Sequence, residues 1–242
     1  MKTIGIIGAM PSEVDHLTAR LAEPVVTALA GRHFVQGRLG GCTAVVVQSG
    51  IGKVNAAVTA QLLIDRFAPD ALLNTGMAGG LAPELAVKDL VIGTEAVQHD
   101  FDITAFGHAP GYIDSDGDDQ QPTVFVADPA LVAAAGKAAQ RVLPAGSRAL
   151  CGRIASGDVF VDDSALKWRI RAQFGAAAAE MEGAAIAQTA AANGVPFLIL
   201  RTISDLAEHQ ASVSFEELER YVGQLAGDIT VALLEEYNTA SI

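Results

Sequence analysis

Two patterns of apolar residues alternate along nearly the whole chain, one typical of strands and the other typical of helices. The sequence therefore predicts an alternation of strands and helices. Short apolar runs predict buried strands, whereas apolar residues at helical spacing, such as Val14, Leu17 and Leu21, predict amphipathic helices. The strands are expected at 3–7, 34–39, 43–48, 71–75, 89–96, 148–154 and 196–203, and the helices at 13–21, 55–67, from 128 onward, 176–192 and 214–237. No internal repeat or linker interrupts this order, so residues 1–242 are expected to form a single α/β domain around a mixed, largely parallel twisted sheet.

Small or polar turns follow several of the predicted strands, where open α/β sheets bind ligands. These turns are Gly8-Ala9-Met10, Ser49-Gly50-Ile51-Gly52, the stretch from Thr75 to Gly80, and Ser204-Asp205. Burying a carboxylate such as that of Asp205 at the end of an apolar strand is costly. Asp205 is therefore a candidate functional residue.

A second acidic signal, Glu180-Met181-Glu182, lies inside the alanine-rich stretch that predicts the helix over 176–192. Two residues that are two positions apart on a helix point about 160° away from each other. Only one of the two glutamates is therefore expected to face a pocket, and the other is expected at the surface or behind the site.

Composition and charge narrow the possible partners. The 242 residues include 28 acidic and 16 basic side chains, a net charge of −12, which disfavours nucleic acid and anionic membrane surfaces. Two isolated cysteines argue against a disulfide framework and a zinc site. The N-terminus is typical of a first strand and not of a signal peptide, and no apolar run is long enough to span a bilayer. A cytoplasmic protein is expected.

Several binding motifs are incomplete in this sequence. The stretch from Ser49 to Lys53 lacks the leading glycine of a P-loop, and Val54 replaces its Ser or Thr. Gly5-Ile6-Ile7-Gly8 does not have the spacing of a dinucleotide-binding loop. His99-Asp100 has no matching ligands elsewhere, and the acidic stretch 107–122 lacks the closing glutamate of an EF-hand, so a solvated loop is expected there. No cofactor and no metal are expected.

Seven motifs, taken together and in order, strongly resemble the bacterial 5'-methylthioadenosine/S-adenosylhomocysteine nucleosidases of the purine nucleoside phosphorylase-like superfamily. They are Gly5-Ile6-Ile7-Gly8-Ala9-Met10 with Glu13; Ser49 to Val54; Asn74-Thr75-Gly76 with Ala78 to Leu81; Asp102 to Gly107; Ser156-Gly157-Asp158 with Phe160; Glu180-Met181-Glu182; and Arg201 with Ile203-Ser204-Asp205. The resemblance implies a three-layer fold with helices flanking the sheet and a homodimer. It also implies hydrolysis of the N-glycosidic bond of adenine nucleosides in methionine salvage and the activated methyl cycle.

The resemblance also implies roles for individual residues. Asp205, oriented by Ser204, would protonate the leaving adenine at N7, and Glu13 would activate the attacking water. Glu182 would hold the ribose hydroxyls, Met181 would pack on the sugar, and Arg201 would order the water and Glu182. The other implied binding residues are Phe160 and Val161 for adenine; Met77, Ala78 and Gly79 at the sugar; and Met10, Ile51, Ile103, Phe106 and Phe215 around the 5'-alkylthio group. Met77 stands where many relatives carry a small or hydroxyl residue.

Three alternatives to this function remain. A nucleoside phosphorylase needs a cationic phosphate site, but neither 9–13 nor 76–79 contains an arginine, and Glu13 would repel phosphate. An aminodeoxyfutalosine nucleosidase would use the same chemistry as the main hypothesis. A non-catalytic nucleoside-binding protein would not require Glu13, Glu182 and Asp205 together, so an enzyme is favoured. The order of preference among methylthioadenosine, S-adenosylhomocysteine and 5'-deoxyadenosine stays open.

Overall fold

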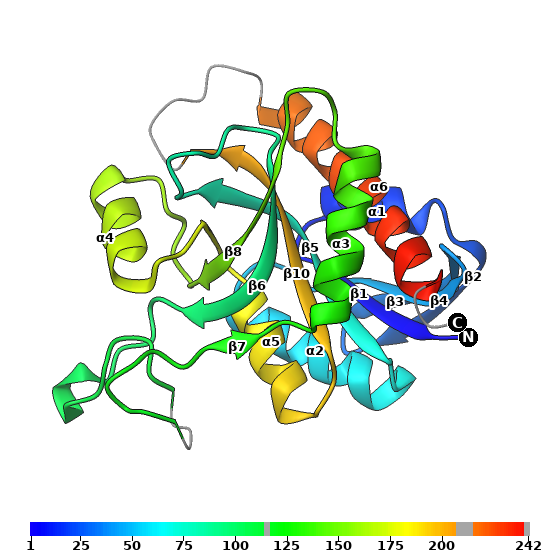
Figure 1. The fold of residues 1–242 in the computed structure, drawn as a ribbon. Coiled ribbons are helices and arrows are strands. Elements are labelled where there is room, and N and C mark those ends of the chain that lie inside the picture. Colours follow the sequence, from blue (N-terminus) through cyan, green and yellow to red (C-terminus); the bar gives the residue numbers. More distant parts are fainter. Residues whose placement is uncertain (114–116, 207–214, 240–242) are drawn as a thin grey trace.

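The computed structural model describes residues 1–113, 117–206 and 215–239, with the side chains of 215–217 left out (Figure 1). Its strands are β1 (Thr3–Gly8), β2 (Ala22–Leu29), β3 (Arg32–Leu39), β4 (Cys42–Gln48), β5 (Ala71–Gly80), β6 (Leu90–Gln98), β7 (Phe125–Val126), β8 (Ala149–Ser156), β9 (Ala178–Glu180) and β10 (Phe197–Asp205). Its helices are α1 (Pro11–Thr18), α2 (Lys53–Phe67), α3 (Pro129–Val142), α4 (Ser164–Phe174), α5 (Gly183–Ala192) and α6 (Phe215–Thr239), with a short 3₁₀ turn, η1, at Thr104–Phe106.

The strands form one mixed sheet in the order β10-β6-β8-β9-β5-β1-β4-β3-β2, with β7 beside β6. Because β10 also pairs with β5, the five strands β10, β6, β8, β9 and β5 close on themselves. The predicted α/β class with a mixed sheet is confirmed. The finer expectation of a largely parallel sheet is wrong: among the described strands, five pairs are antiparallel and five are parallel.

Helices cover the sheet in two groups. Helices α1, α3 and α6 pack together, and α2 packs on α5 at the other side of the sheet (Figure 1). The predicted helix start at Asp128 is confirmed, because its carboxylate accepts a hydrogen bond of 2.9 Å from Leu131 N at the first turn of α3. Among the described residues, no helix is both long and apolar enough to cross a membrane.

Aliphatic side chains and alanines fill the core, as the low aromatic content predicts. The strands β1 and β10 are buried almost throughout, which brings their C-terminal ends into the interior. A smaller apolar cluster, which includes Val161, Ile170 and Phe174, lies under α4. This second cluster anchors the loop between β8 and α4.

The structure differs from the predicted elements at four places. Strand β5 runs on through Gly80, so the expected turn after Thr75 is strand. The residues 176–192 form strand β9 and then helix α5, where one helix was expected. The exposed edge strand β2 and the helix α4 were not predicted. The capping box that begins at Ser214 falls partly outside the described residues.

Candidate active site

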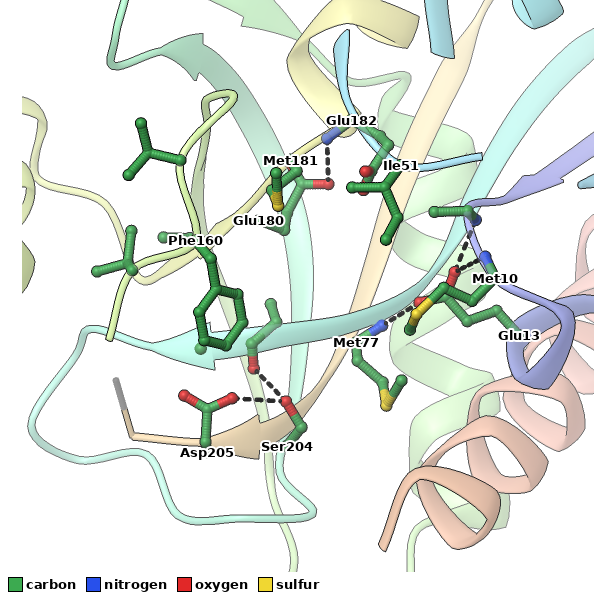
Figure 2. Close-up of a pocket in the computed structure, with 16 residues that line it drawn as sticks. Met10, Glu13, Ile51, Met77, Phe160, Glu180, Met181, Glu182, Ser204 and Asp205 are labelled. Carbon is green, nitrogen blue, oxygen red and sulfur yellow. Dashed lines mark hydrogen bonds between the residues drawn. The ribbon is translucent and has the colours of Figure 1, made fainter. Parts of the chain in front are cut away.

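A pocket of about 270 Å³ lies where β1, β5, β9 and β10 end (Figure 2). Its size is close to the lower end of small-molecule sites, roughly 300–1,000 Å³. Twelve of the predicted site residues line it: Met10, Glu13, Ile51, Met77, Ala78, Gly79, Phe160, Val161, Met181, Glu182, Ser204 and Asp205. The strand ends therefore bring together residues that are up to 195 positions apart, such as Met10 and Asp205.

Glu13 lies in the first turn of α1, and its side chain is buried at one end of the pocket. Its carboxylate accepts backbone hydrogen bonds from Ala9 (2.7 Å), Met10 (3.1 Å) and Met77 (2.9 Å). Burial raises the pKa of Glu13 despite the nearby charge of Arg201 and these three donors, because desolvation disfavours the ionised form. Gly76 leaves room for this carboxylate, since a Cβ there would lie 2.3 Å from Glu13 Oε1.

Glu182 is the residue just before α5, and its buried side chain also lines the pocket. Its Oε1 accepts a hydrogen bond of 2.8 Å from Gly52 N, at the start of α2. Burial, together with the negative charge of Glu180, raises the pKa of Glu182 to about 7, against the opposing effect of Arg201. Glu182 therefore titrates near neutral pH.

Glu180 also lines the pocket, which corrects the expectation that it lies at the surface or behind the site. The two glutamates do not share a helix, because the chain is still a strand at Glu180 and α5 begins only at Gly183. The Glu180 carboxylate accepts hydrogen bonds from Ser156 Oγ and from the backbone of Glu182 (3.1 Å) and Gly183 (2.8 Å). It also pairs with Arg201.

Arg201 lies outside the pocket lining, on β10, where its side chain is only 2% exposed. Its guanidinium donates to Glu180 Oε2 and to Asn74 Oδ1. Its charge acts on Glu13 and Glu182 through the protein interior, and the three glutamates together raise the pKa of Arg201 despite its burial. Arg201 is the countercharge of the carboxylate cluster.

Asp205 ends β10 at the far side of the pocket from Glu13 (Figure 2). Ser204 Oγ donates a 2.8 Å hydrogen bond to Asp205 Oδ2, and the same hydroxyl lies 3.4 Å from the Ala78 carbonyl oxygen. Phe160, which is 66% exposed, points toward the space above Asp205. An aromatic face and a carboxylic acid thus meet at one end of the pocket, and the glutamates meet at the other.

Comparison with known proteins identifies the family of this chain. A sequence model of the Phosphorylase superfamily matches residues 3–237. The chain is 44% identical over 234 residues to the 5'-methylthioadenosine/S-adenosylhomocysteine nucleosidase of Shewanella sediminis, an alignment that covers 96% of this chain and 99% of that protein. The chain belongs to this nucleosidase family of the Phosphorylase superfamily.

Solved nucleosidase structures have the same fold. The enzyme of Neisseria meningitidis, in complex with methylthio-immucillin-A, superposes with a TM-score of 0.89 at 39% identity and covers 97% of this chain and 99% of its own. A futalosine hydrolase of Helicobacter pylori superposes with a TM-score of 0.87 at 31% identity, covering 97% and 98% of the two chains. Each of these two structures therefore aligns with this nucleosidase over nearly the full length of both chains.

Two further predicted binding residues of this nucleosidase are not among the described residues that line the pocket. Ile103 and Phe106 lie at η1, away from the pocket lining, and Phe106 is 80% exposed. The side chain of Phe215 lies outside the described residues.

Four further residues line the nucleosidase pocket that the sequence analysis did not assign to it: Ala9, Val159, Ala179 and Glu180. Glu180 could have been found from Arg201, because an arginine in the middle of a buried apolar strand requires an acidic partner. Gly183, which interrupts the alanine-rich stretch, was the available signal for a later helix start.

Proposed function

We propose that this protein hydrolyses the N-glycosidic bond of 5'-methylthioadenosine and S-adenosylhomocysteine, and also of 5'-deoxyadenosine, releasing adenine and a 5-substituted ribose. This reaction would serve methionine salvage and the activated methyl cycle. The observation that carries the proposal is the convergence of Glu13, Glu182 and Asp205 on one pocket. The identity of 44% with a named nucleosidase over nearly the full length supports it.

Departure of adenine requires a proton on the base, and Asp205 is the group proposed to deliver it. Phe160 would stack on the purine, and the backbone at Val161 would bind its edge. The hydrogen bond from Ser204 Oγ fixes which way the Asp205 carboxyl group faces. General acid catalysis of this kind contributes roughly 10²- to 10⁴-fold to the rate.

Loss of adenine leaves positive charge on the ribose, which the acidic end of the pocket would stabilise. Glu182 is proposed to bind the ribose hydroxyls, with Met181 against the sugar. The positive charge of the ribosyl cation favours the ionised form of Glu182, whose pKa is raised to about 7 in the free protein. Arg201, held by Glu180, limits the repulsion among the carboxylates.

Glu13 is proposed to take a proton from the attacking water. Its raised pKa makes it a stronger base than an ordinary carboxylate at neutral pH, and its three backbone hydrogen bonds hold it in one orientation. Met77 N–H and the glycine at 76 place the β5 backbone against it.

Water is favoured over phosphate as the nucleophile because the pocket has no cation for phosphate. No lysine or arginine is among the described residues that line it, and Glu13 lies where an anion would be repelled. The test is release of adenine from methylthioadenosine in phosphate-free buffer, repeated with added phosphate. Equal rates support hydrolysis, strict dependence on phosphate would make the protein a phosphorylase, and binding without adenine release would make it a nucleoside-binding protein.

Aminodeoxyfutalosine is a second candidate substrate, suggested by the similarity to the futalosine hydrolase of Helicobacter pylori. The partly open pocket, with Ile51 and Phe160 more than half exposed, would accept a bulky 5' substituent. Competition between this nucleoside and methylthioadenosine, followed by the rate at which each nucleoside is consumed, ranks the two.

We further propose that the protein acts as a single-domain homodimer in the cytoplasm. Exposed apolar side chains support the dimer: Val54 and Val58 on α2 are 75% and 43% exposed, and Ile51 and Phe106 are exposed as well. A dimer that covered them would bring Phe106 and its neighbours beside a pocket. Light scattering after gel filtration gives the mass, and a monomer at assay concentration would contradict the proposal.

A further inference from the structure

A network of hydrogen bonds beside the pocket joins three sequence features that the proposed reaction does not use: Lys53, His99-Asp100 and Asp158. Lys53 is the first residue of α2, His99-Asp100 follows the end of β6, and Asp158 follows the end of β8. The loop between β8 and α4 continues into Phe160, and the loop before α2 contains Gly52, the donor to Glu182. The network thus joins two pocket-forming loops.

The centre of the network is an ion pair between Lys53 and Asp100. Lys53 Nζ lies 2.5 Å from Asp100 Oδ1 and 3.0 Å from Gln98 Oε1. The side chains of Lys53 and Asp100 are only 16% and 21% exposed. Burial alone would raise the pKa of Asp100, but hydrogen bonds from Lys53 and from Asp158 N lower it, so the carboxylate stays ionised.

Asp158 connects this ion pair to helix α2. Its backbone N donates to Asp100 Oδ2 at 2.8 Å, and its own Oδ1 accepts a hydrogen bond of 2.8 Å from Lys53 N. The turn after β8, which contains Asp158, is also held by His99, just after β6. His99 N donates a hydrogen bond of 3.0 Å to the Ser156 carbonyl oxygen. Burial lowers the pKa of His99, because desolvation disfavours its charged form.

The start of α2 has no cap of its own, because Gly52 precedes the helix and has no side chain to accept from its free N–H groups. Two carboxylates from elsewhere in the chain take this place: Asp158 accepts from Lys53 N, and Glu182 accepts from Gly52 N. Gly52 is required there, since its φ is 97° and a Cβ would lie 3.0 Å from Asp158 Oδ1. The positive end of the helix favours both ionised carboxylates.

We propose that Lys53, Asp100 and Asp158 are positioning residues for the reaction: they hold the start of α2 so that Gly52 N–H stays hydrogen-bonded to Glu182. The inference rests on the proposed function, because Glu182 matters as the group that binds the ribose. None of the three side chains lines the pocket. Their effect reaches the substrate through Glu182.

A change of this network must appear in the titration of Glu182. Four groups act on Glu182: the side chains of Glu180 from β9, Glu13 from α1 and Arg201 from β10, and the N–H of Gly52 just before α2. The two glutamates raise its pKa, whereas Arg201 and Gly52 N–H lower it. If α2 shifts and Gly52 N–H is lost, the pKa of Glu182 rises above its present value. Substrate binding then requires a higher pH.

The experiment compares Asp158→Ala with Asp158→Asn, because the amide oxygen of asparagine can still accept from Lys53 N–H. We expect Asp158→Ala to lower kcat/KM about tenfold at neutral pH and to move the acidic limb of its pH profile up by about one unit. Asp158→Asn should recover most of the wild-type rate. Lys53→Met, at the other end of the network, should repeat the shift. Arg141→Met, which removes an exposed ion pair between α3 and α6, should leave both unchanged.

A second readout does not depend on catalysis. The carboxyl ¹³C signal of Glu182, assigned with Glu182→Gln, gives its pKa by NMR in the wild type and in Asp158→Ala. A higher pKa in the variant supports the network even if the wild type releases no adenine, in which case the proposed function alone fails. A folded Asp158→Ala and Lys53→Met with the wild-type pKa and pH profile would overturn the inference, as would a uniform loss of rate without a shift.

Discussion

Arg201 Nε lies 3.2 Å from Glu180 Oε2, and the two side chains form a buried ion pair in which Glu180 lines the pocket and Arg201 does not. Arg201 is the countercharge for Glu180 and also acts on Glu13 and Glu182. One guanidinium therefore opposes three buried carboxylates. The charge of the site is unbalanced toward the negative side, which suits a cationic intermediate and disfavours an anionic nucleophile.

Replacement of Arg201 should destabilise the fold. Arg201→Met leaves Glu180 buried without its partner, and removal of one member of a buried pair costs about 3–5 kcal/mol. Urea unfolding measures this cost. Glu180→Gln combined with Arg201→Met should recover part of the loss, because position 180 no longer carries an unpaired buried charge. Unfolding of Arg201→Met at the wild-type midpoint would contradict the role of Arg201 as countercharge.

Glu182→Gln should change how stability depends on pH. A pKa raised from 4.5 to about 7 means that the folded state binds the proton more tightly than the unfolded state. The free energy of unfolding therefore falls as pH rises from about 4.5 to about 7, by roughly 3 kcal/mol at most from this group. Glu182→Gln removes this contribution, so the variant should exceed the wild type in stability at pH 8 while losing activity. Urea unfolding at pH 5 and pH 8 gives the change in the free energy of unfolding with pH for the wild type and for the variant. An equal change in both proteins would show that Glu182 titrates normally.

Gly76→Ala should disable Glu13 without unfolding the protein. The added Cβ would lie 2.3 Å from Glu13 Oε1, so the carboxylate must leave its position. A displacement of about 1 Å can lower catalysis about a hundredfold. The matched control is Gly136→Ala in α3, where an added Cβ meets nothing within 4 Å. Rates of adenine release for the two variants should differ by that factor, and equal rates would argue against Glu13 as the base.

Asp205→Asn should remove the proton donor and leave substrate binding largely unchanged. We expect kcat to fall by roughly 10²- to 10⁴-fold. Ser204→Ala, which removes the 2.8 Å hydrogen bond to Asp205, should have a smaller effect, about tenfold. Single-turnover adenine release together with calorimetric binding of methylthioadenosine separates the two steps. A large loss of affinity in Asp205→Asn with unchanged kcat would place Asp205 in binding alone.

Patterns in the sequence predicted the strand ends better than the segments between them. Asp205 was found because a carboxylate at the end of an apolar run is unusual, and that rule depends on local sequence alone. The residues of β9 could not be recognised in the same way, because alanine-rich sequence favours a helix by intrinsic propensity. Pairing of β9 with β5 and β8 overrides that propensity, and no nearby residue signals it.

The glycine-rich end of β5 shows the same limit. Glycines after Thr75 are typical of a turn, yet they continue as strand because β10 and β9 pair with them. Gly76 is small for a reason found only in three dimensions, namely the approach of the Glu13 carboxylate from a helix more than 60 positions earlier. The resemblance to nucleosidases named Glu13, but the sequence alone did not indicate what holds it.

The hydrogen-bond donors around Glu13 are all peptide N–H groups, those of Ala9, Met10 and Met77. Exchange of the side chain at any of these positions keeps the donor, unless the new residue is proline. Substitutions at these three positions would therefore reshape the pocket without removing the donors that orient the Glu13 carboxylate.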